Sequence, residues 1–324
     1  MSPEPNDYLI TYRDAGVELD LLDEFDEPEK LPVLDDPEDL PNHEIRSEAP
    51  PFEAARARLV AEGYIATDRA FSQPDAYLDA TAYAGSAVVR SSILRSSIFS
   101  CGRVDRRWCD RTVHPMAYAR CGRFAGYRAY QEDLTVALAL TYLLPGHQTS
   151  QSFSIDIRDW IHFCGWGQTP RSADRLVDSL TCLSHARFEM TRPNYSMVCF
   201  RLFDWLKITG NTVRGKISGG LIELQDRNGR GTYIPLARRK ALREGLQTWL
   251  AGWVLATKCD APIPLPTLHA HSGSGHATIS EFGRDVRKAL DRLEIVGLVR
   301  SWTQRPNERL ERNMITIQKA RFIR

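Results

Sequence analysis

The 324-residue sequence lacks the uninterrupted apolar run of roughly 18 to 20 residues that a membrane-spanning helix needs. Its first residues, MSPEPNDY, have neither the positive segment nor the apolar core of a secretory signal peptide. The seven cysteines are odd in number and irregularly spaced, which is typical of reduced thiols. Together these absences predict a cytoplasmic protein with no membrane contact and no disulfides.

Two motifs that resemble catalytic sites each lack an essential member. Gly210–Lys216 fits the first seven positions of a phosphate-binding loop, but Ile217 replaces the Ser or Thr that holds Mg²⁺. The segment ISGGLIEL then predicts a strand, where phosphate binding requires a helix N-terminus. His269 and His271 resemble the metal-binding pair of rolling-circle nicking enzymes. Those enzymes need a nucleophilic tyrosine beyond the pair, and the last tyrosine here, Tyr233, precedes it.

Four other residues carry zinc-binding side chains, namely Cys101, Cys109, His114 and Cys121. They do not have the Cys-x₂₋₄-Cys spacing of a zinc knuckle. We therefore predict no metal, no cofactor and no catalytic residue, and a protein that is not an enzyme. A DNA-nicking enzyme remains a distant alternative.

Charge is distributed very unevenly along the chain. Residues 1–53 hold 17 Asp and Glu against 3 Lys and Arg, and the remainder holds 39 basic and 24 acidic residues, a net charge of +15. The acidic segment also contains EFDEPEKLPVLDDPEDLP, whose repeated prolines and low hydrophobicity oppose a packed core. We predict a disordered acidic tail over 1–52 and a basic body that attracts a polyanion.

The next part of the chain, 53–127, is interpreted as a lead-in segment to the first folded domain. FEAARARLVAEGY predicts a short helix that begins near Phe52. The Arg-rich stretch 101–127 shows no clear periodicity, so strands or a hairpin remain open there.

The pattern changes several times between residues 128 and 235. YQEDLTVALALTYLL has apolar residues at helical spacing and stops at Pro145–Gly146. SFSIDI alternates as a strand, and the helices IDIRDWIHFCGW and RSADRLVDSLTCLSHA follow it. ARFEMTR, MVCFRLFDWLKI, KISGGLIEL and GTYIPL predict a sheet. Helix, strand, helix-turn-helix and hairpin is the order of a winged helix.

The same order repeats over 236–324. PLARRKALREGLQTWLAGWVLATK predicts one long helix, PIPLP an edge strand, TLHAHSG a brief helix, and ATISEFGRDVRKALDRLEIVGL a further helix that ends at Gly297. LVRSWTQ and NMITIQKARF predict two strands on either side of a basic loop over 305–309. The predicted fold class is α+β, with tandem winged-helix domains (128–235 and 236–324) behind an acidic disordered tail.

The helix near residues 279–293 is the candidate DNA-reading element. Phe282, Val286, Ala289, Leu290 and Leu293 share one face, which we expect to pack inward. The opposite face carries Ser280, Arg284, Arg287 and Lys288, residue types that contact base edges and phosphates. The following hairpin adds Arg305, Arg309 and Arg312. A solvated basic face is the ordinary alternative, and the basic hairpin favours DNA.

The corresponding helix of the first domain, 171–186, has a mixed outward face. Arg171 and Arg175 are its candidate DNA-binding residues, but Asp174 and Asp178 lie beside them. Carboxylates repel phosphates, so we predict weaker DNA binding by this domain. A role in dimerisation or positioning remains equally open.

From about Arg90 to Arg321 the sequence resembles plasmid replication initiators of the TrfA type. The resemblance rests on SSILRSSIFS, EDLTVALALTYLL, FSIDIRDWIHFCGWGQTPRSADRLVDSLTCLSHARFEM and VRKALDRLEIVGLVRSW. It departs from the pattern at 101–127 and 211–230. The resemblance implies binding to repeated origin sites (iterons) in double-stranded DNA and opening of an A·T-rich segment. It also implies recruitment of the host's initiator, helicase and sliding clamp, and a homodimer is possible.

A clamp-binding peptide of the form Gln-Leu-Ser/Asp-Leu-Phe belongs to the same resemblance. Glu18–Leu22, Glu-Leu-Asp-Leu-Leu, lacks both the Gln and the terminal aromatic of that form. A stray apolar patch in a disordered tail is the favoured interpretation. A winged-helix transcriptional regulator is the nearest functional alternative, and the protein sequence does not separate it from an initiator.

Overall fold

The computed structural model describes the stretches 51–61, 65–66, 86–102, 106–116, 119–144, 152–191, 197–225, 231–257, 262–307 and 312–320. All of them fall within the unit Ala49–Arg324. The predicted acidic tail, apart from its last two residues, and the clamp-like peptide Glu18–Leu22 lie outside the described residues.

The first module, defined here as 131–217, contains the predicted elements in order, with the strands β8 (Arg187–Thr191) and β9 (Met197–Arg201) inserted between its last helix and its hairpin. It comprises α4 (Gln131–Leu143), β7 (Ser152–Asp156), α5 (Ile157–Cys164), α6 (Pro170–His185), and the hairpin of β10 (Phe203–Thr209) and β11 (Thr212–Ile217). Strand β11 pairs antiparallel with both β10 and β7, which gives the strand order β10-β11-β7. The strand before the helix-turn-helix therefore joins the hairpin that follows it.

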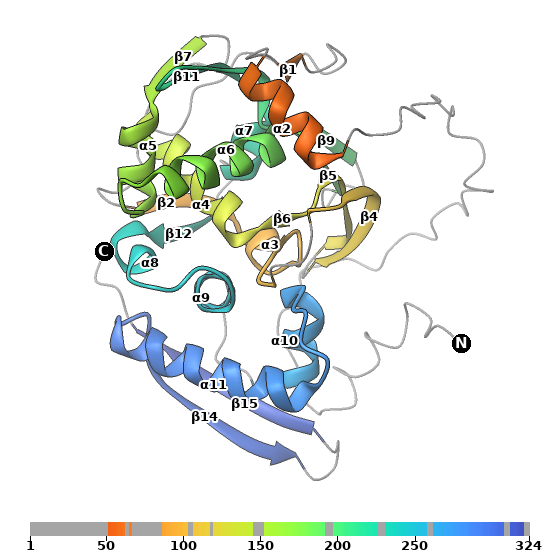
Figure 1. Cartoon of the computed structure of the whole chain (residues 1–324). Helices are drawn as coiled ribbons and strands as arrows, with labels where there is room; N and C mark the ends of the chain where they lie inside the picture. The colour runs from red at the N-terminus through yellow and green to blue at the C-terminus, as the bar shows by residue number, and fades with distance from the viewer. Residues whose placement is uncertain are drawn as a thin grey trace, which may run out of the picture. The chain divides into compact units, whose positions relative to one another are not determined.

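The second module, defined here as 246–319, repeats this arrangement. It comprises α9 (Leu246–Ala256), β13 (Ile263–Pro264), α10 (Leu265–Ser272), α11 (Ile279–Ile295), β14 (Val299–Asn307) and β15 (Arg312–Lys319). Strand β15 pairs with both β14 and β13, so the strand order is β13-β15-β14. Helix α11 runs along the β14–β15 hairpin (Figure 1). The two modules thus share one arrangement, in which the strand before two helices pairs with the second strand of the hairpin after them.

Further elements surround these modules. They are α2 (Phe52–Ala61), β1 (Ile65–Ala66), β2 (Ser86–Arg90), α3 (Ser91–Leu94), β3 (Phe99–Ser100), β4 (Trp108–Met116), β5 (Ala119–Tyr127), β6 (Ala129–Tyr130), β8 (Arg187–Thr191), β9 (Met197–Arg201), α7 (Gly220–Gln225), β12 (Gly231–Pro235) and α8 (Leu236–Lys240). Strands β4 and β5 form a hairpin, which confirms one of the two expectations for 101–127. This hairpin continues through β8 to β9, and β2 pairs with β12. The segment predicted as a lead-in therefore shares its sheets with the first module.

Two apolar cores hold these elements together. One contains the buried residues of α2, α4, α5 and α6 and of most strands before β12, and Trp160 is fully buried in it. The other lies between α9, α10, α11 and the β13-β15-β14 sheet, around residues such as Trp249 and Phe282. Leu255 packs against both cores. The second module thus has an apolar core of its own.

The structure corrects two predicted elements. The long helix predicted from 235 to 258 is two helices, α8 and α9, separated at Ala241–Gly245. Gly245 there adopts a φ of 109°, which favours glycine. ISGGLIEL, predicted as a strand, instead leads into helix α7. A Cβ on Gly220 would lie 2.2 Å from the Arg201 carbonyl oxygen, so glycine allows α7 to approach β9 closely. In both places tertiary contacts override the local pattern.

Candidate nucleic-acid interface

Local capping fixes where α11 begins. The Thr278 hydroxyl accepts a hydrogen bond from the Glu281 amide at 3.2 Å, which caps the helix N-terminus. The preceding helix, α10, ends at Gly273 with a φ of 62°. A Cβ on Gly273 would also lie 2.6 Å from the Cβ of Ser100, so glycine is required by both conformation and space. The turn of this helix-turn-helix is therefore set by its own sequence and by its contact with β3.

The inward face of α11 is the predicted one. Its buried apolar residues include Phe282, Val286, Ala289, Leu290 and Leu293. Phe282, Leu290 and Leu293 are completely buried. Burial of each such side chain contributes roughly 1.5–3 kcal/mol, so the rotation of the helix about its axis is strongly determined.

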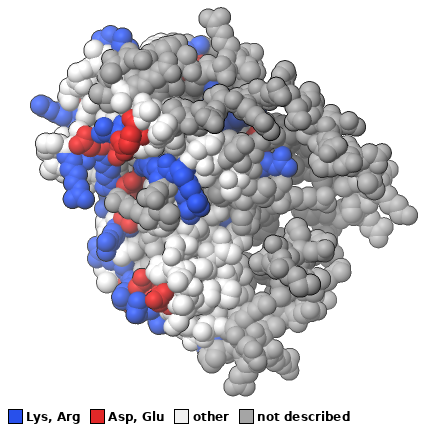
Figure 2. Space-filling view, turned by 45° about the vertical axis from the view of Figure 1, so that its right-hand side comes forward, with Lys and Arg blue, Asp and Glu red and all other residues white. Residues whose placement is uncertain are grey.

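The outward face of α11 carries the predicted candidate residues. Ser280, Arg284, Arg287 and Lys288 are all exposed. The Arg284 side chain is 62% exposed and that of Lys288 is 70% exposed. In Figure 2, Lys and Arg side chains gather along the left-hand edge of the view, with Asp and Glu among them. The structure confirms that these residues share a solvent-facing surface, and their contact with DNA remains a prediction.

Two residues that the sequence did not indicate lie beside this surface. His276, in the turn before α11, contacts Asp285 on the helix, with Nε2 and Oδ2 3.0 Å apart. The hydrogen bond from His276 lowers the pKa of Asp285, and Lys288, 3.4 Å away, adds to the shift. The pair ties the turn to the first half of α11. A carboxylate next to the basic residues Arg284 and Lys288 was the signal that could have revealed it.

The β14–β15 hairpin extends further than predicted. Arg305, predicted at the start of a loop, lies in β14 opposite Met314 and is exposed. Pro306 also belongs to β14, an edge strand of its sheet, where proline is tolerated. Arg312 begins β15, and its side chain lies outside the described residues, as does Arg309.

A direct contact connects α11 to this hairpin. Arg287 Nη1 donates a hydrogen bond to Gln304 Oε1 on β14, at 3.1 Å. Arg287 and Arg305 therefore belong to adjoining parts of one surface. Such a hairpin beside a recognition helix can reach along a DNA backbone.

Helix α6 in the first module begins with the same device. The Thr169 hydroxyl accepts a hydrogen bond from the Ser172 amide at 3.2 Å, and the preceding helix ends at Gly165 with a φ of 75°. Arg171 is exposed. Arg175 is instead held in an ion pair, with its Nε 2.8 Å from Glu132 Oε2, and its guanidinium stacks on Trp166. The structure thus separates the two candidate residues of this helix.

The two carboxylates of α6 have a partner that the sequence did not indicate. Arg56 on α2 contacts Asp174 at 2.8 Å and Asp178 at 2.5 Å. Helix α2 packs against α6, and its Ala55 and Leu59 are buried. The second half of α6, from Ser179 to Ser184, is buried on all sides. Only its first turns are therefore accessible to a partner.

The structure describes the surroundings of the two motifs that resembled catalytic sites. Gly210 and Asn211 form the turn between β10 and β11, so the loop returns in a hairpin instead of leading directly into a helix. His269 packs its ring against Phe282, and His271 Nδ1 lies 3.1 Å from the Arg95 carbonyl oxygen. Both histidines are half-buried.

Metal-binding side chains are not gathered in the part of the chain that the structure describes. No group of three or more His, Cys, Asp or Glu residues lies close enough there to hold an ion. Of the predicted zinc candidates, Cys101 is a thiol whose pKa burial raises to about 11. The side chains of His114 and Cys121 lie outside the described residues. Among the described helices, none is long and apolar enough to cross a bilayer.

Comparison with known proteins gives structural likeness without sequence likeness. No protein-family model matches the sequence, and no curated protein matches it. Domains 2 and 3 of RctB share 12% identity with it at a TM-score of 0.50, over 72% of this chain and 98% of that one.

Two further solved structures are similar. A second structure of the same RctB domains has 13% identity and a TM-score of 0.49, over 71% of this chain and 96% of that one. The Pi initiator protein in complex with iteron DNA has 13% identity and a TM-score of 0.44, over 58% of this chain and 94% of that one. The described structure therefore has the fold of RctB domains 2 and 3.

Proposed function

We propose that this protein is a plasmid replication initiator built from two winged helices in tandem. It binds repeated sites (iterons) in double-stranded origin DNA, helps to open the origin and recruits host replication proteins. It acts in the cytoplasm by binding and distorting DNA, without making or breaking covalent bonds. The host initiator, helicase and sliding clamp are its proposed partners, and a homodimer is one proposed form.

The observation that carries this proposal is the outward face of α11. Arg284, Arg287 and Lys288 are exposed together on a helix whose other face is fixed by a buried apolar stripe. Arg287 also contacts the neighbouring hairpin, so the helix and hairpin present one basic surface. Arginine pairs bidentately with guanine in the major groove, and lysine neutralises phosphates.

Further support comes from the repeated order of elements. In each module a strand before the helix-turn-helix pairs with the second strand of the hairpin after it. That pairing is expected of a winged helix. The described residues also share the fold of RctB domains 2 and 3. A transcriptional regulator would use the same basic surface, so DNA context has to separate the two functions.

The test is nuclease footprinting of the purified protein on the DNA that flanks its own gene. An initiator protects several directly repeated sites beside an A·T-rich stretch and makes that stretch reactive to single-strand probes. A repressor protects one palindrome within a promoter. Protection of the palindrome alone would contradict the proposal. Metal-dependent nicking of supercoiled plasmid by the same preparation would contradict the absence of catalysis.

A further inference from the structure

Arg239 lies on α8, between the two modules along the chain, and only 4% of the residue is exposed. Burial lowers the pKa of its guanidinium, and the Glu244 carboxylate opposes that shift. A buried cation is tolerated only where hydrogen-bond acceptors and an opposite charge replace the lost water. The hydrogen-bond partners of Arg239 therefore show which elements it connects.

One side of the guanidinium is bonded to the first helix of the first module. Nε and Nη2 donate to the Thr135 hydroxyl on α4, at 3.2 and 3.0 Å. Nη2 also donates to the main-chain and side-chain oxygens of Gln131, at 3.1 and 3.2 Å. Gln131 in turn donates through Nε2 to the Phe99 carbonyl in β3, at 2.6 Å. These bonds fix α8 against the N-terminal turn of α4.

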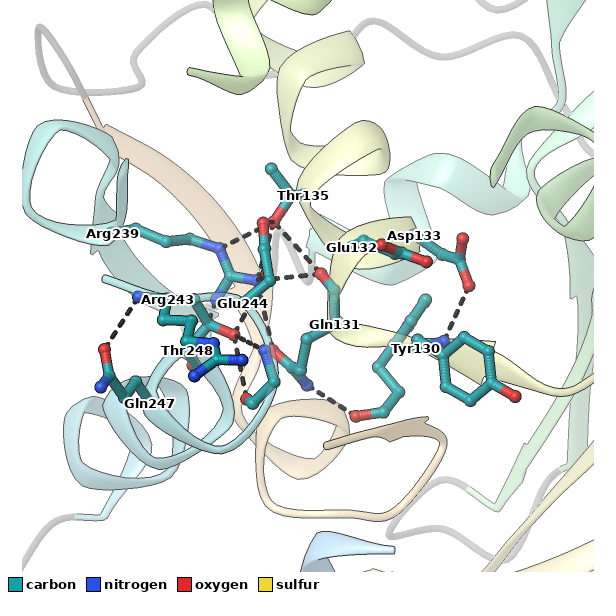
Figure 3. A network of polar contacts seen from close by, with 12 residues as sticks. Tyr130, Gln131, Glu132, Asp133, Thr135, Arg239, Arg243, Glu244, Gln247 and Thr248 are labelled. Atoms are coloured by element: carbon teal, nitrogen blue, oxygen red, sulfur yellow. Dashed lines mark hydrogen bonds and ion pairs between the residues drawn. The ribbon is translucent and has the colours of Figure 1, made fainter. Parts of the chain in front are cut away.

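The other side of the guanidinium reaches the first helix of the second module. Nη1 donates to the Thr248 carbonyl oxygen in α9 at 3.2 Å. Glu244 completes the network by accepting from the hydroxyls of Thr135 and Thr248, at 2.7 and 3.2 Å. Figure 3 shows Arg239 and Glu244 facing Gln131 and Thr135 across this junction. One side chain thus bonds to α4 and to α9 at the same time.

The same stretch also contacts the end of α11. Arg238 Nη1 donates to the Gly297 carbonyl oxygen, and Arg292 Nη2 donates to the Ala241 carbonyl oxygen at 2.8 Å. The segment 236–245 is therefore hydrogen-bonded to the first module and to the helix of the second module that carries the basic face. A displacement of this segment would therefore also displace α11.

The junction that Arg239 crosses is polar and incompletely packed. A cavity of about 390 Å³ adjoins it, lined by residues that include Gln131, Thr135, Arg239 and Glu244. Outside this network, Trp249 Nε1 donates to the Ser96 carbonyl at 3.1 Å and provides a second connection between α9 and the earlier part of the chain. Ala256 of α9 belongs to the first apolar core and Leu255 packs against both cores, so directional hydrogen bonds act together with apolar contacts in fixing how the modules are held.

We propose that Arg239 is a positioning residue that holds the two modules at a fixed separation, so that the protein recognises two DNA subsites only at one spacing. This inference rests on the proposed DNA binding through α11 and adds a contact of the first module with the same duplex. A guanidinium suits this role because its planar fork donates to several acceptors at once. Lysine has a single ammonium and cannot bond to all of them.

The test compares Arg239→Met and Arg239→Lys with Arg243→Met as a control. Arg243 is an exposed cation four residues along the same segment, so its replacement removes an equal charge. A duplex selected by the wild-type protein from a random pool serves as the probe, together with a version that carries about 5 bp inserted at the centre of the footprint. Such an insertion turns one subsite by about half a helical turn relative to the other.

We expect the insertion to weaken binding of the wild-type and Arg243→Met proteins about tenfold or more, which corresponds to one lost base contact. For Arg239→Met we expect the insertion to weaken binding less than about threefold, because modules that Arg239 no longer holds can follow the displaced subsite. Arg239→Lys should lie between these values. The inference would be overturned if the insertion weakened binding equally in wild type and Arg239→Met. It would also be overturned if the insertion left the affinity of the wild-type protein unchanged.

Two controls separate this inference from other failures. Circular dichroism and thermal unfolding show whether Arg239→Met folds, with a Tm lower by about 10 °C expected from loss of a buried, bonded cation. If Arg239→Met does not fold, Arg239→Lys takes its place in the comparison, and wild-type spacing dependence in that variant would then overturn the inference. A wild-type protein that selects no sequence from the pool would contradict the proposed function instead.

Discussion

Helices α6 and α11 begin in the same way and differ in what surrounds them. Each follows a glycine with positive φ that ends the preceding helix, and each has an N-cap threonine, Thr169 or Thr278. Counted from these threonines, Arg284 corresponds to Arg175, which Glu132 holds, and Arg287 corresponds to Asp178, which Arg56 holds. Lys288 corresponds to the buried Ser179.

This comparison teaches that the helix-turn-helix sequence device does not by itself make a DNA-reading surface. The three basic positions of α11 remain exposed, although Arg287 contacts Gln304 on β14. Their counterparts in α6 are covered by α2 and by contacts with α4. We infer a division of roles in which the second module makes the main base contacts and the first adds weaker contacts to the same duplex.

The largest expected effect comes from exchanging a corresponding pair of residues. Ser179→Lys should destabilise the protein by more than about 4 kcal/mol, because it places a charge at a fully buried position. Lys288→Ser should change the free energy of unfolding by less than about 0.5 kcal/mol, because Lys288 is 70% exposed. Urea unfolding of both variants measures this, and similar values for the two would show that the helices are equally covered.

Removal of Arg56 sharpens the electrostatic part of the comparison. Arg56→Ala leaves Asp174 and Asp178 uncompensated, so affinity for random duplex DNA should fall about threefold at 50 mM salt, and stability by about 1 kcal/mol. Asp174→Asn combined with Asp178→Asn should raise that affinity. Titration of labelled random duplex at two salt concentrations measures both changes. An unchanged affinity in both variants would mean that the α6 face does not approach DNA.

The acidic tail should act on both modules alike, through charge alone. Removal of residues 1–50 takes away 16 carboxylates and 3 basic groups that can compete with phosphates for the basic body. Binding to random DNA should strengthen about twofold to threefold at about 50 mM salt, and the gain should fade by a few hundred mM. Specific affinity should change less. Superimposable binding curves at low salt would exclude competition by the tail.

The smallest expected effect depends on pH and is confined to the second module. The pKa of Asp285 is lowered in the folded state by His276, so its contribution to stability is complete above the ordinary Asp pKa of about 4. That contribution is lost as the pH falls through the lowered pKa. Asp285 is 38% exposed, so solvent screening limits the effect to a few tenths of a kcal/mol. Asp285→Asn should flatten the dependence of the free energy of unfolding on pH between pH 5 and 3. The corresponding position of α6 is Leu176, which does not titrate.

The sequence was sufficient for features that depend on local periodicity. The buried stripe of α11 follows from a residue pattern within about 20 positions. The strand before each helix-turn-helix followed from the same kind of pattern. These features are local, so tertiary context changed only their ends, as in the extension of β14 to Asn307.

The sequence was insufficient wherever a distant contact decides the outcome. Arg56 and Asp174 are 118 residues apart, and nothing near either residue indicates the other. Arg239 and Thr135 are 104 residues apart, and their bond accompanies the break between α8 and α9 that the helical pattern concealed. Arg175 was predicted to lie at a DNA surface. The sequence gives no sign that its partner is Glu132, because Glu132 belongs to another helix.

The most direct test of the division of roles measures discrimination between DNA sequences. Arg284→Ala combined with Arg287→Ala and, separately, Arg171→Ala are titrated at one salt concentration against a duplex selected by the wild-type protein and against a random duplex. Each bidentate base contact is worth about 1–3 kcal/mol, so the double variant should lose two or more decades of the affinity ratio, with random binding retained. Arg171→Ala should lower the ratio by about tenfold or less, because the first module adds only weaker contacts. An unchanged ratio in the double variant, or an equal loss in Arg171→Ala, would contradict the assignment of the main sequence reading to α11.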